Sequence, residues 1–180
     1  MGMRRVLYVW LCLAGALTAG ELSNRRAPGF SLPDSRLQQW DLQDFRGKVV
    51  VLDIMKTDCP DCQKLAVTLE RVRARYGDKV QILSIVNPPD NQTTVAQFIA
   101  TYKVQTPILF DCGQVAASYL KATPQRPSIT VPHVFLIDQN GIIRNDFAST
   151  PQNKAIFHGD GLMAEIDKLL APPPRPAGKK

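Results

Sequence analysis

The 180-residue sequence has only four cysteines and two histidines, which limits the metal sites it can build. Its closely spaced cysteines are Cys59 and Cys62, in KTDCPDCQKL. A structural zinc site needs a second pair of ligands, and Cys112, His133 and His158 have no paired spacing. The sequence therefore argues against a zinc site and predicts no bound metal or other cofactor beyond a redox-active Cys59–Cys62 pair.

Most of the chain also lacks an excess of charge. The net charge is +6, but Arg4, Arg5, Arg175, Lys179 and Lys180 lie near the two ends and supply five of those charges. The interior is close to neutral, so no nucleic-acid partner is predicted. We find no repeats, and the length suits one domain.

The sequence has no apolar run long enough to span a bilayer comfortably. Residues 1–20 combine Arg4 and Arg5 with the short apolar stretch VLYVWLCLAGAL, which contains Cys12, and end in small residues before Glu21. This pattern is typical of a signal peptide, with an uncleaved anchor as the alternative. We expect a domain over 21–171 and a Pro-rich basic tail over 172–180. Export implies an oxidising compartment, and the odd count of remaining cysteines argues against a purely structural disulfide framework.

Apolar runs alternate with helical patterns along the rest of the chain. KVVVLDIM and VQILSIV read as buried strands, and a helix is expected from Pro60 to about Gly77. A second helix is expected over 92–102, and Asp111 can cap a third. TPILF, VPHVFLID and IIRNDF read as further strands, followed by a closing helix that carries Leu162. The fold class is α/β, a three-layer sandwich around a mixed sheet.

The position of the cysteine pair indicates redox chemistry. Cys59 lies just before the predicted helix, where unpaired N–H groups and the helix dipole favour a thiolate, and Cys62 lies one turn inside. Cys59 is therefore the expected nucleophile and Cys62 the more buried resolving thiol. Asp58 and Asp61 oppose a neighbouring thiolate, while Lys56 and Lys64 favour it, so we expect a pair that is not strongly oxidising.

Three motifs together resemble a known family: DLQDFRGK before a strand, CPDC at a strand–helix junction, and VP before a strand ending in LIDQNG. They resemble the thioredoxin-like fold, and most closely the exported thiol–disulfide oxidoreductases of the TlpA/ResA type, related to the AhpC/TSA peroxiredoxins. The resemblance covers about residues 27–171. It implies a strand–helix insertion in the middle of the core, to which the interval between Val86 and Val131 is similar.

The resemblance also implies roles for further residues. Pro132 matches the cis-proline that lies against the dithiol, and Val131 would offer backbone hydrogen bonds to a substrate. Pro60, between the two cysteines, is also expected to contact the substrate. The alternative for Val131 and Pro132 is an ordinary strand entry. Asp53 matches the buried acid that exchanges a proton with the resolving cysteine; the alternative is a solvated side chain at a sheet edge.

Some positions depart from the family. Asp58 replaces the usual Trp before the first cysteine, and Leu65 replaces an acid. Cys112 falls in the first turn of a predicted helix; a small buried hydrophobe is favoured over a second resolving thiol. His133 either tunes the thiolate or joins both cysteines in binding copper, but a surface-facing histidine is favoured.

The favoured function is an exported thiol–disulfide oxidoreductase, periplasmic or otherwise extracytoplasmic and soluble after signal cleavage, that reduces or isomerises protein disulfides. Its expected partners are a disulfide-bearing exported protein, for instance in cytochrome c maturation, and a membrane thiol donor of the DsbD/CcdA kind; a monomer is expected. One alternative is a peroxiredoxin-like peroxidase, although Lys56 and Leu52 occupy the positions where that chemistry needs Thr and Pro, and Thr57 is one position out of register. The other is a copper carrier that uses Cys59, Cys62 and His133.

Overall fold

The centre of the molecule is the strand β3, Val49–Met55, in which every residue is buried. The computed structural model describes residues 22–172; the predicted signal peptide at 1–20 and nearly all of the tail at 172–180 lie outside them. β3 pairs in parallel with β4, Val80–Val86, and antiparallel with β6, His133–Ile137. A strand with neighbours on both sides and helices over both faces must be apolar throughout, as VVVLDIM nearly is.

The sheet is five-stranded and mixed, in the order β5-β4-β3-β6-β7. β5, Ile108–Phe110, extends the parallel side, and β7, Ile143–Ala148, forms a hairpin with β6. A separate antiparallel pair joins β1, Ser31–Pro33, to β2, Gln39–Asp41. The mixed sheet predicted from the sequence is confirmed.

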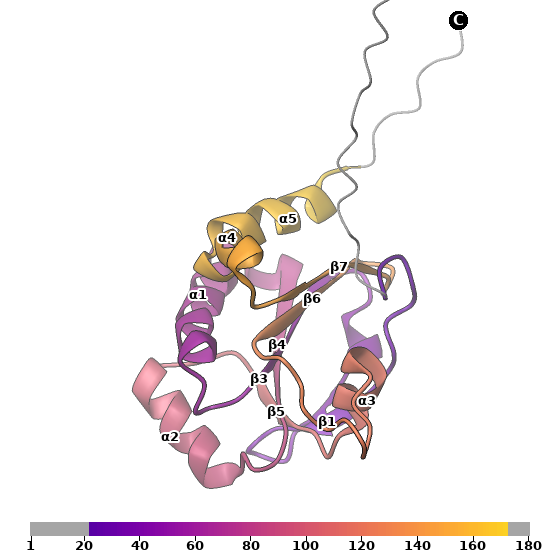
Figure 1. Ribbon diagram of the computed structural model, residues 1–180. Coiled ribbons are helices and arrows are strands. Elements are labelled where there is room, and N and C mark those ends of the chain that lie inside the picture. The colour runs from indigo at the N-terminus through magenta and orange to yellow at the C-terminus, as the bar shows by residue number, and fades with distance from the viewer. Residues whose placement is uncertain (1–21, 173–180) are drawn as a thin grey trace, which may run out of the picture.

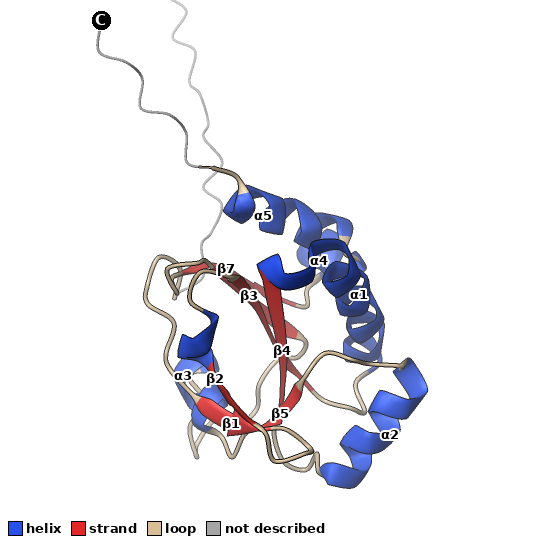
Figure 2. Ribbon diagram, turned by 180° about the vertical axis from the view of Figure 1, so that it is seen from behind, coloured by secondary structure: helices blue, strands red, loops and turns tan. Residues whose placement is uncertain are grey.

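Helices cover both faces of this sheet and make three layers (Figures 1 and 2). On one face lie α1, Pro60–Tyr76, and α5, Asp160–Leu170, which bury Leu65, Leu69, Leu162 and Ile166 against β3 and β4. On the other face lie α3, Gln114–Leu120, and the β1–β2 pair, with Val115 and Tyr119 against Leu52 and Phe135. Alternation of side chains along β3 sends neighbouring residues to these two cores.

The remaining elements complete the predicted order. α2, Gln92–Tyr102, begins at a capping box formed by Asn91 and Thr94. The interval from Val86 to Val131 contains α2, β5 and α3, so the strand–helix insertion expected there is present. Asp111 accepts hydrogen bonds from the first amides of α3, as predicted for its cap.

Short helical segments were not expected from the sequence. Three are 3-10 turns, at Leu42–Phe45, Gly77–Lys79 and Pro151–Asn153, and the fourth is α4, Lys154–His158. His158 therefore ends a helix. No helix within residues 22–172 is long and apolar enough to cross a bilayer.

Candidate active site

The two cysteines meet at the start of α1, directly after the carboxyl end of β3. Cys59 is the N-cap residue, and its Sγ accepts a hydrogen bond from the backbone N–H of Cys62 at 3.3 Å. Pro60 occupies the first turn, where a missing N–H costs nothing. A donor aimed at Sγ stabilises negative charge on that sulfur. Local geometry thus supports Cys59 as the nucleophile of the pair.

The two thiols differ sharply in exposure. Cys59 is partly exposed, whereas Cys62 is fully buried among Met55, Ala66 and Val95. Both are unbonded, so the structure describes the reduced form. A disulfide in solution can therefore reach Cys59 but not Cys62.

A buried carboxyl group lies behind Cys62. Asp53, on β3, is completely buried, and this burial raises its pKa to about 7, against a hydrogen bond from Ser84 that lowers it. Burial also raises the pKa of the Cys62 thiol, and the charge of Asp53 raises it further. The sequence prediction of burial for Asp53 is confirmed, and the alternative of a solvated sheet edge is wrong, because β3 is the central strand.

The Val131–Pro132 peptide bond is cis and lies beside the thiols. The Val131 carbonyl oxygen is 3.9 Å from the Sγ of Cys59. The carbonyl of Pro132 accepts a hydrogen bond from the backbone N–H of Ser149 at 3.1 Å, which ties this segment to the end of β7. Val131 and Pro132 therefore border the same site as Cys59.

A clamp on the loop before Cys59 was missed by the sequence analysis. The carboxylate of Asp90 accepts hydrogen bonds from the backbone N–H of Thr57, at 3.1 Å, and from the Thr57 hydroxyl. It also accepts one from the Thr94 hydroxyl at 2.9 Å, and the side chain of Gln63 donates to the Thr57 carbonyl at 3.0 Å. Asp90 follows Pro88-Pro89, a turn signal that pointed to a loop but gave no hint of its contact with Thr57.

The charged residues around the motif lie at the surface. Asp58 and Asp61 are exposed, and Asp61 pairs with Lys64 at 3.0 Å within the first turns of α1. The carbonyl of Lys56 accepts a hydrogen bond from the N–H of Cys59 at 3.4 Å. Exposed ion pairs are worth little, so Lys64 offsets Asp61 only weakly.

Two favoured expectations about side chains are wrong. Cys112 is exposed rather than buried, and it precedes α3 instead of lying in its first turn, because the helix begins at Gln114 with Gly113 as its N-cap. It lines a pocket of about 430 Å³ with Lys56 and Ile129, to which neither Cys59 nor Cys62 contributes. His133 does not face solvent: its side chain is 12% exposed.

His133 lies on the sheet face opposite to Asp53. In the β3–β6 ladder it pairs with Ile54, while Val134 pairs with Asp53. Its ring stacks on Phe135, with centroids 4.7 Å apart, and its Nε2 lies 3.2 Å from Asp146. Residues 22–172 contain no group of three His, Cys, Asp or Glu side chains placed to hold a metal ion. The copper site of Cys59, Cys62 and His133 is therefore not favoured.

Comparison with known proteins agrees with this geometry. Residues 24–146 match the family model described as AhpC/TSA family. The chain belongs to the AhpC/TSA family.

The chain is also similar to named redox proteins. It is 26% identical to the thioredoxin-like protein YneN of Bacillus subtilis over 75% of this chain and 76% of that protein. It is 26% identical to the thiol-disulfide oxidoreductase ResA of Bacillus thuringiensis subsp. konkukian, over 65% of this chain and 64% of ResA. The fold matches a crystal structure of a putative thiol:disulfide interchange protein DsbE from Chlorobium tepidum, with a TM-score of 0.67, 22% identity, and coverage of 83% of this chain and 98% of that one. These likenesses bear out the TlpA/ResA-type resemblance and the thioredoxin-like fold.

Proposed function

We propose that the protein is an exported thiol–disulfide oxidoreductase that reduces or isomerises protein disulfides through Cys59 and Cys62. The observation that carries this proposal is the order of three groups from the surface inward: a reachable Cys59, a buried Cys62 and, behind it, the buried carboxyl of Asp53. The names of the ResA and YneN relatives support the same chemistry.

The reaction has two exchange steps. The Cys59 thiolate attacks one sulfur of a substrate disulfide, a mixed disulfide forms, and the other substrate sulfur leaves as a thiolate. Cys62 then gives its proton to the Asp53 carboxylate and attacks the Sγ of Cys59, which releases the second substrate sulfur. The substrate gains two electrons and the pair becomes a Cys59–Cys62 disulfide, so no other cofactor is required.

Each remaining group assists one step. The Cys62 N–H stabilises the Cys59 thiolate before the attack. It stabilises the same thiolate again if the mixed disulfide reverts and Cys59 is the leaving group. Val131 and Pro132, with Pro60, form the border against which an extended substrate segment would lie. Because Asp53 has a pKa of about 7, it can accept the Cys62 proton and return it near neutral pH.

We further propose the setting of this reaction. Residues 1–20 would direct export to the periplasm or another extracytoplasmic space, where substrates carry disulfides. The reduced pair would be restored by a membrane thiol donor of the DsbD/CcdA kind, and an apocytochrome c is one candidate substrate. We expect the mature chain to act as a monomer.

A peroxidase function is less well supported by the site. Thr57, the only hydroxyl side chain in the loop between β3 and Cys59, donates its hydrogen bond to Asp90. The Thr57 hydroxyl therefore does not point its hydrogen bond toward the Cys59 sulfur. Lys56 and Leu52 stand where a peroxidase has Thr and Pro, and they do not replace that hydroxyl donor. Hydrogen-bond donors aimed at the peroxide are what such a site requires.

The test is to equilibrate the reduced mature protein in graded thiol–disulfide buffers and count free thiols, with Cys62→Ser as a trap for the mixed disulfide. We expect one two-electron couple, and a covalent adduct only with Cys62→Ser. A potential of about −250 mV or lower would identify a reductase, and one near about −120 mV an oxidant. Rapid oxidation of Cys59 by hydrogen peroxide, with closure lost in Cys112→Ser, would instead identify a peroxidase.

A further inference from the structure

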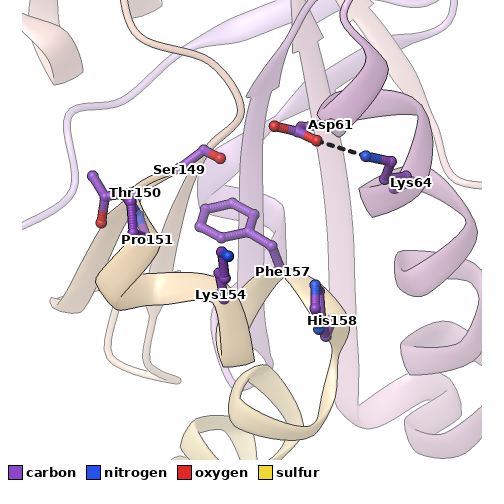
Figure 3. Close-up of a pocket in the computed structure, with 8 residues that line it drawn as sticks. All are labelled: Asp61, Lys64, Ser149, Thr150, Pro151, Lys154, Phe157 and His158. Carbon is purple, nitrogen blue, oxygen red and sulfur yellow. Dashed lines mark hydrogen bonds and ion pairs between the residues drawn. The ribbon is translucent and has the colours of Figure 1, made fainter.

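A groove of about 430 Å³ opens beside the cysteine pair, and the mechanism above does not use it. One wall is the first turn and a half of α1, which supplies Asp61 and Lys64. The other is the segment 149–158, which leaves β7 and forms α4. Figure 3 shows the side chains of Phe157, Lys154 and His158 on this second wall, with Asp61 and Lys64 on α1.

The groove is continuous with the active site at two points. Asp61 is one of the two residues between Cys59 and Cys62, so the α1 wall begins within the motif itself. Ser149 donates its backbone N–H to the carbonyl of Pro132, so the opposite wall begins at the cis-proline. A segment of a substrate whose disulfide lies at Cys59 would therefore enter this groove with the residues next to its cysteine.

The walls are held in place by contacts within the described residues. The Thr68 hydroxyl on α1 donates to the carbonyl of Phe157 at 3.4 Å, and Asn153 donates to the carbonyl of Ala148 at 2.9 Å. Gly159 has a φ of +109° and packs so closely on α1 that a Cβ there would lie 2.9 Å from Thr68. The groove is thus a built feature of the fold, already shaped before a partner arrives.

Among the described residues of its lining, the unpaired charge is positive and lies on Lys154. Lys64, Lys154 and His158 line it together with one acid, Asp61, which is already paired with Lys64. Within residues 22–172, Lys154 and His158 form no ion pair, and both are exposed. A cation without a partner attracts a carboxylate, and interactions of this kind select between partners more than they add affinity.

We propose that this groove binds an acidic side chain next to the substrate cysteine, so that the protein prefers disulfides flanked by Glu or Asp. This inference rests on the proposed oxidoreductase function and names the class of segment that the same site takes. Lys154 would contact the carboxylate, with His158 and Lys64 around it, while Phe157 would pack on the aliphatic part of the substrate side chain.

The test uses two peptides, each with one internal disulfide, that differ only in Glu or Gln beside the attacked cysteine. We expect the reduced protein to react with the Glu peptide roughly two- to five-fold faster, as exposed charge pairs allow. The ratio should fall toward one in Lys154→Gln and as salt is raised. The matched control is Lys79→Gln, at the far end of α1, which removes the same charge and should keep the ratio.

The outcomes separate this inference from the function on which it rests. Equal rates for the two peptides in the wild-type protein, or a ratio that survives in both Lys154→Gln and His158→Gln, would overturn acidic docking while leaving the oxidoreductase in place. If neither peptide is reduced, the proposed function itself fails, and docking fails with it. Circular dichroism of each variant establishes that a changed ratio is not caused by unfolding.

Discussion

Asp53 and Ser84 face each other across the parallel β3–β4 ladder, and the Ser84 hydroxyl lies 3.4 Å from Oδ2 of Asp53. Among the described residues the other carboxyl oxygen, Oδ1, has no hydrogen-bond partner. Both side chains are buried. One hydroxyl group is therefore the main polar influence on the carboxyl that would exchange a proton with Cys62.

This arrangement predicts the pH dependence of disulfide closure. The rate at which Cys62 resolves a mixed disulfide should rise with pH through about 7, because only ionised Asp53 can take the proton. Asp53→Asn should remove this rise and slow closure at pH 8 by about 100-fold, the lower range for a general base. Rapid-quench mass spectrometry of a preformed mixed disulfide measures the step.

The variant Ser84→Ala tests the same relationship more finely. Loss of the hydrogen bond that lowers the pKa of Asp53 should move the midpoint of the closure profile upward by roughly half a unit or more. Thr68→Val is a control, since Thr68 is also buried but donates to Phe157. An unmoved midpoint in Ser84→Ala would show that Ser84 does not act on Asp53.

Asp53 should also cost the protein stability at neutral pH. The pKa of Asp53 is raised from 3.8 to about 7, so between pH 4 and 7 the unfolded chain has released a proton that the folded chain retains. The free energy of unfolding therefore falls as pH rises through this range, by about 4 kcal/mol from this group. Urea titrations should show that Asp53→Asn lacks this loss, while the exposed Asp44→Asn keeps it. Parallel pH profiles for Asp53→Asn and the wild type would contradict the prediction.

The clamp on Thr57 should affect the first exchange step more than the second. Asp90→Asn weakens three hydrogen bonds, two of them from Thr57 in the loop that positions Cys59 and one from Thr94, and we expect about 1–2 kcal/mol less stability in chemical denaturation. Stopped-flow measurement should show slower attack by Cys59 and unchanged closure by Cys62. Asp78→Asn, an exposed acid at the other end of α1, is the control. Equal slowing of both steps would mean that Asp90 supports the whole site rather than Cys59.

Cys112 should be reactive but dispensable. It is exposed and lines a pocket without either cysteine of the pair. In the oxidised protein we expect one thiol to react with an alkylating reagent, and Cys112→Ser to react with none while retaining its disulfide-reducing rate. Mass spectrometry after alkylation, together with insulin reduction, checks both statements. A slower closing step in Cys112→Ser would make Cys112 a second resolving thiol.

The sequence was most informative where one local pattern fixes the structure. The apolar run at β3 and the stripe of Leu65, Leu69 and Val72 predict a strand and a helix because burial on a given face requires that periodicity. The position of Cys59 followed from Pro60, which marks the first helical turn. Because Asp53 lies within the apolar run that forms β3, its burial could be predicted from this local segment alone.

The missed features depend on contacts between distant segments. The bond from Thr57 to Asp90 joins two loops, and no periodicity in either loop indicates it. The exposure of Cys112 depends on where α3 begins, and sequence alone places the start of a helix only within a few residues; here the N-cap is Gly113. His133 is covered because β7 places Asp146 beside it, a consequence of hairpin register that its own position in the sequence does not reveal.

The groove beside the cysteine pair is shared between two separately encoded segments. The wall next to the cysteines belongs to the start of α1. The opposite wall, residues 149–158, follows β7, the last strand of the sheet. On the proposed docking, mutations in the later segment would change which partners are accepted without altering Cys59, Cys62 or Asp53. Related proteins could come to act on different substrates through substitutions within residues 149–158 alone. Exchange of that segment would retarget the enzyme while its two cysteines and Asp53 stay in place.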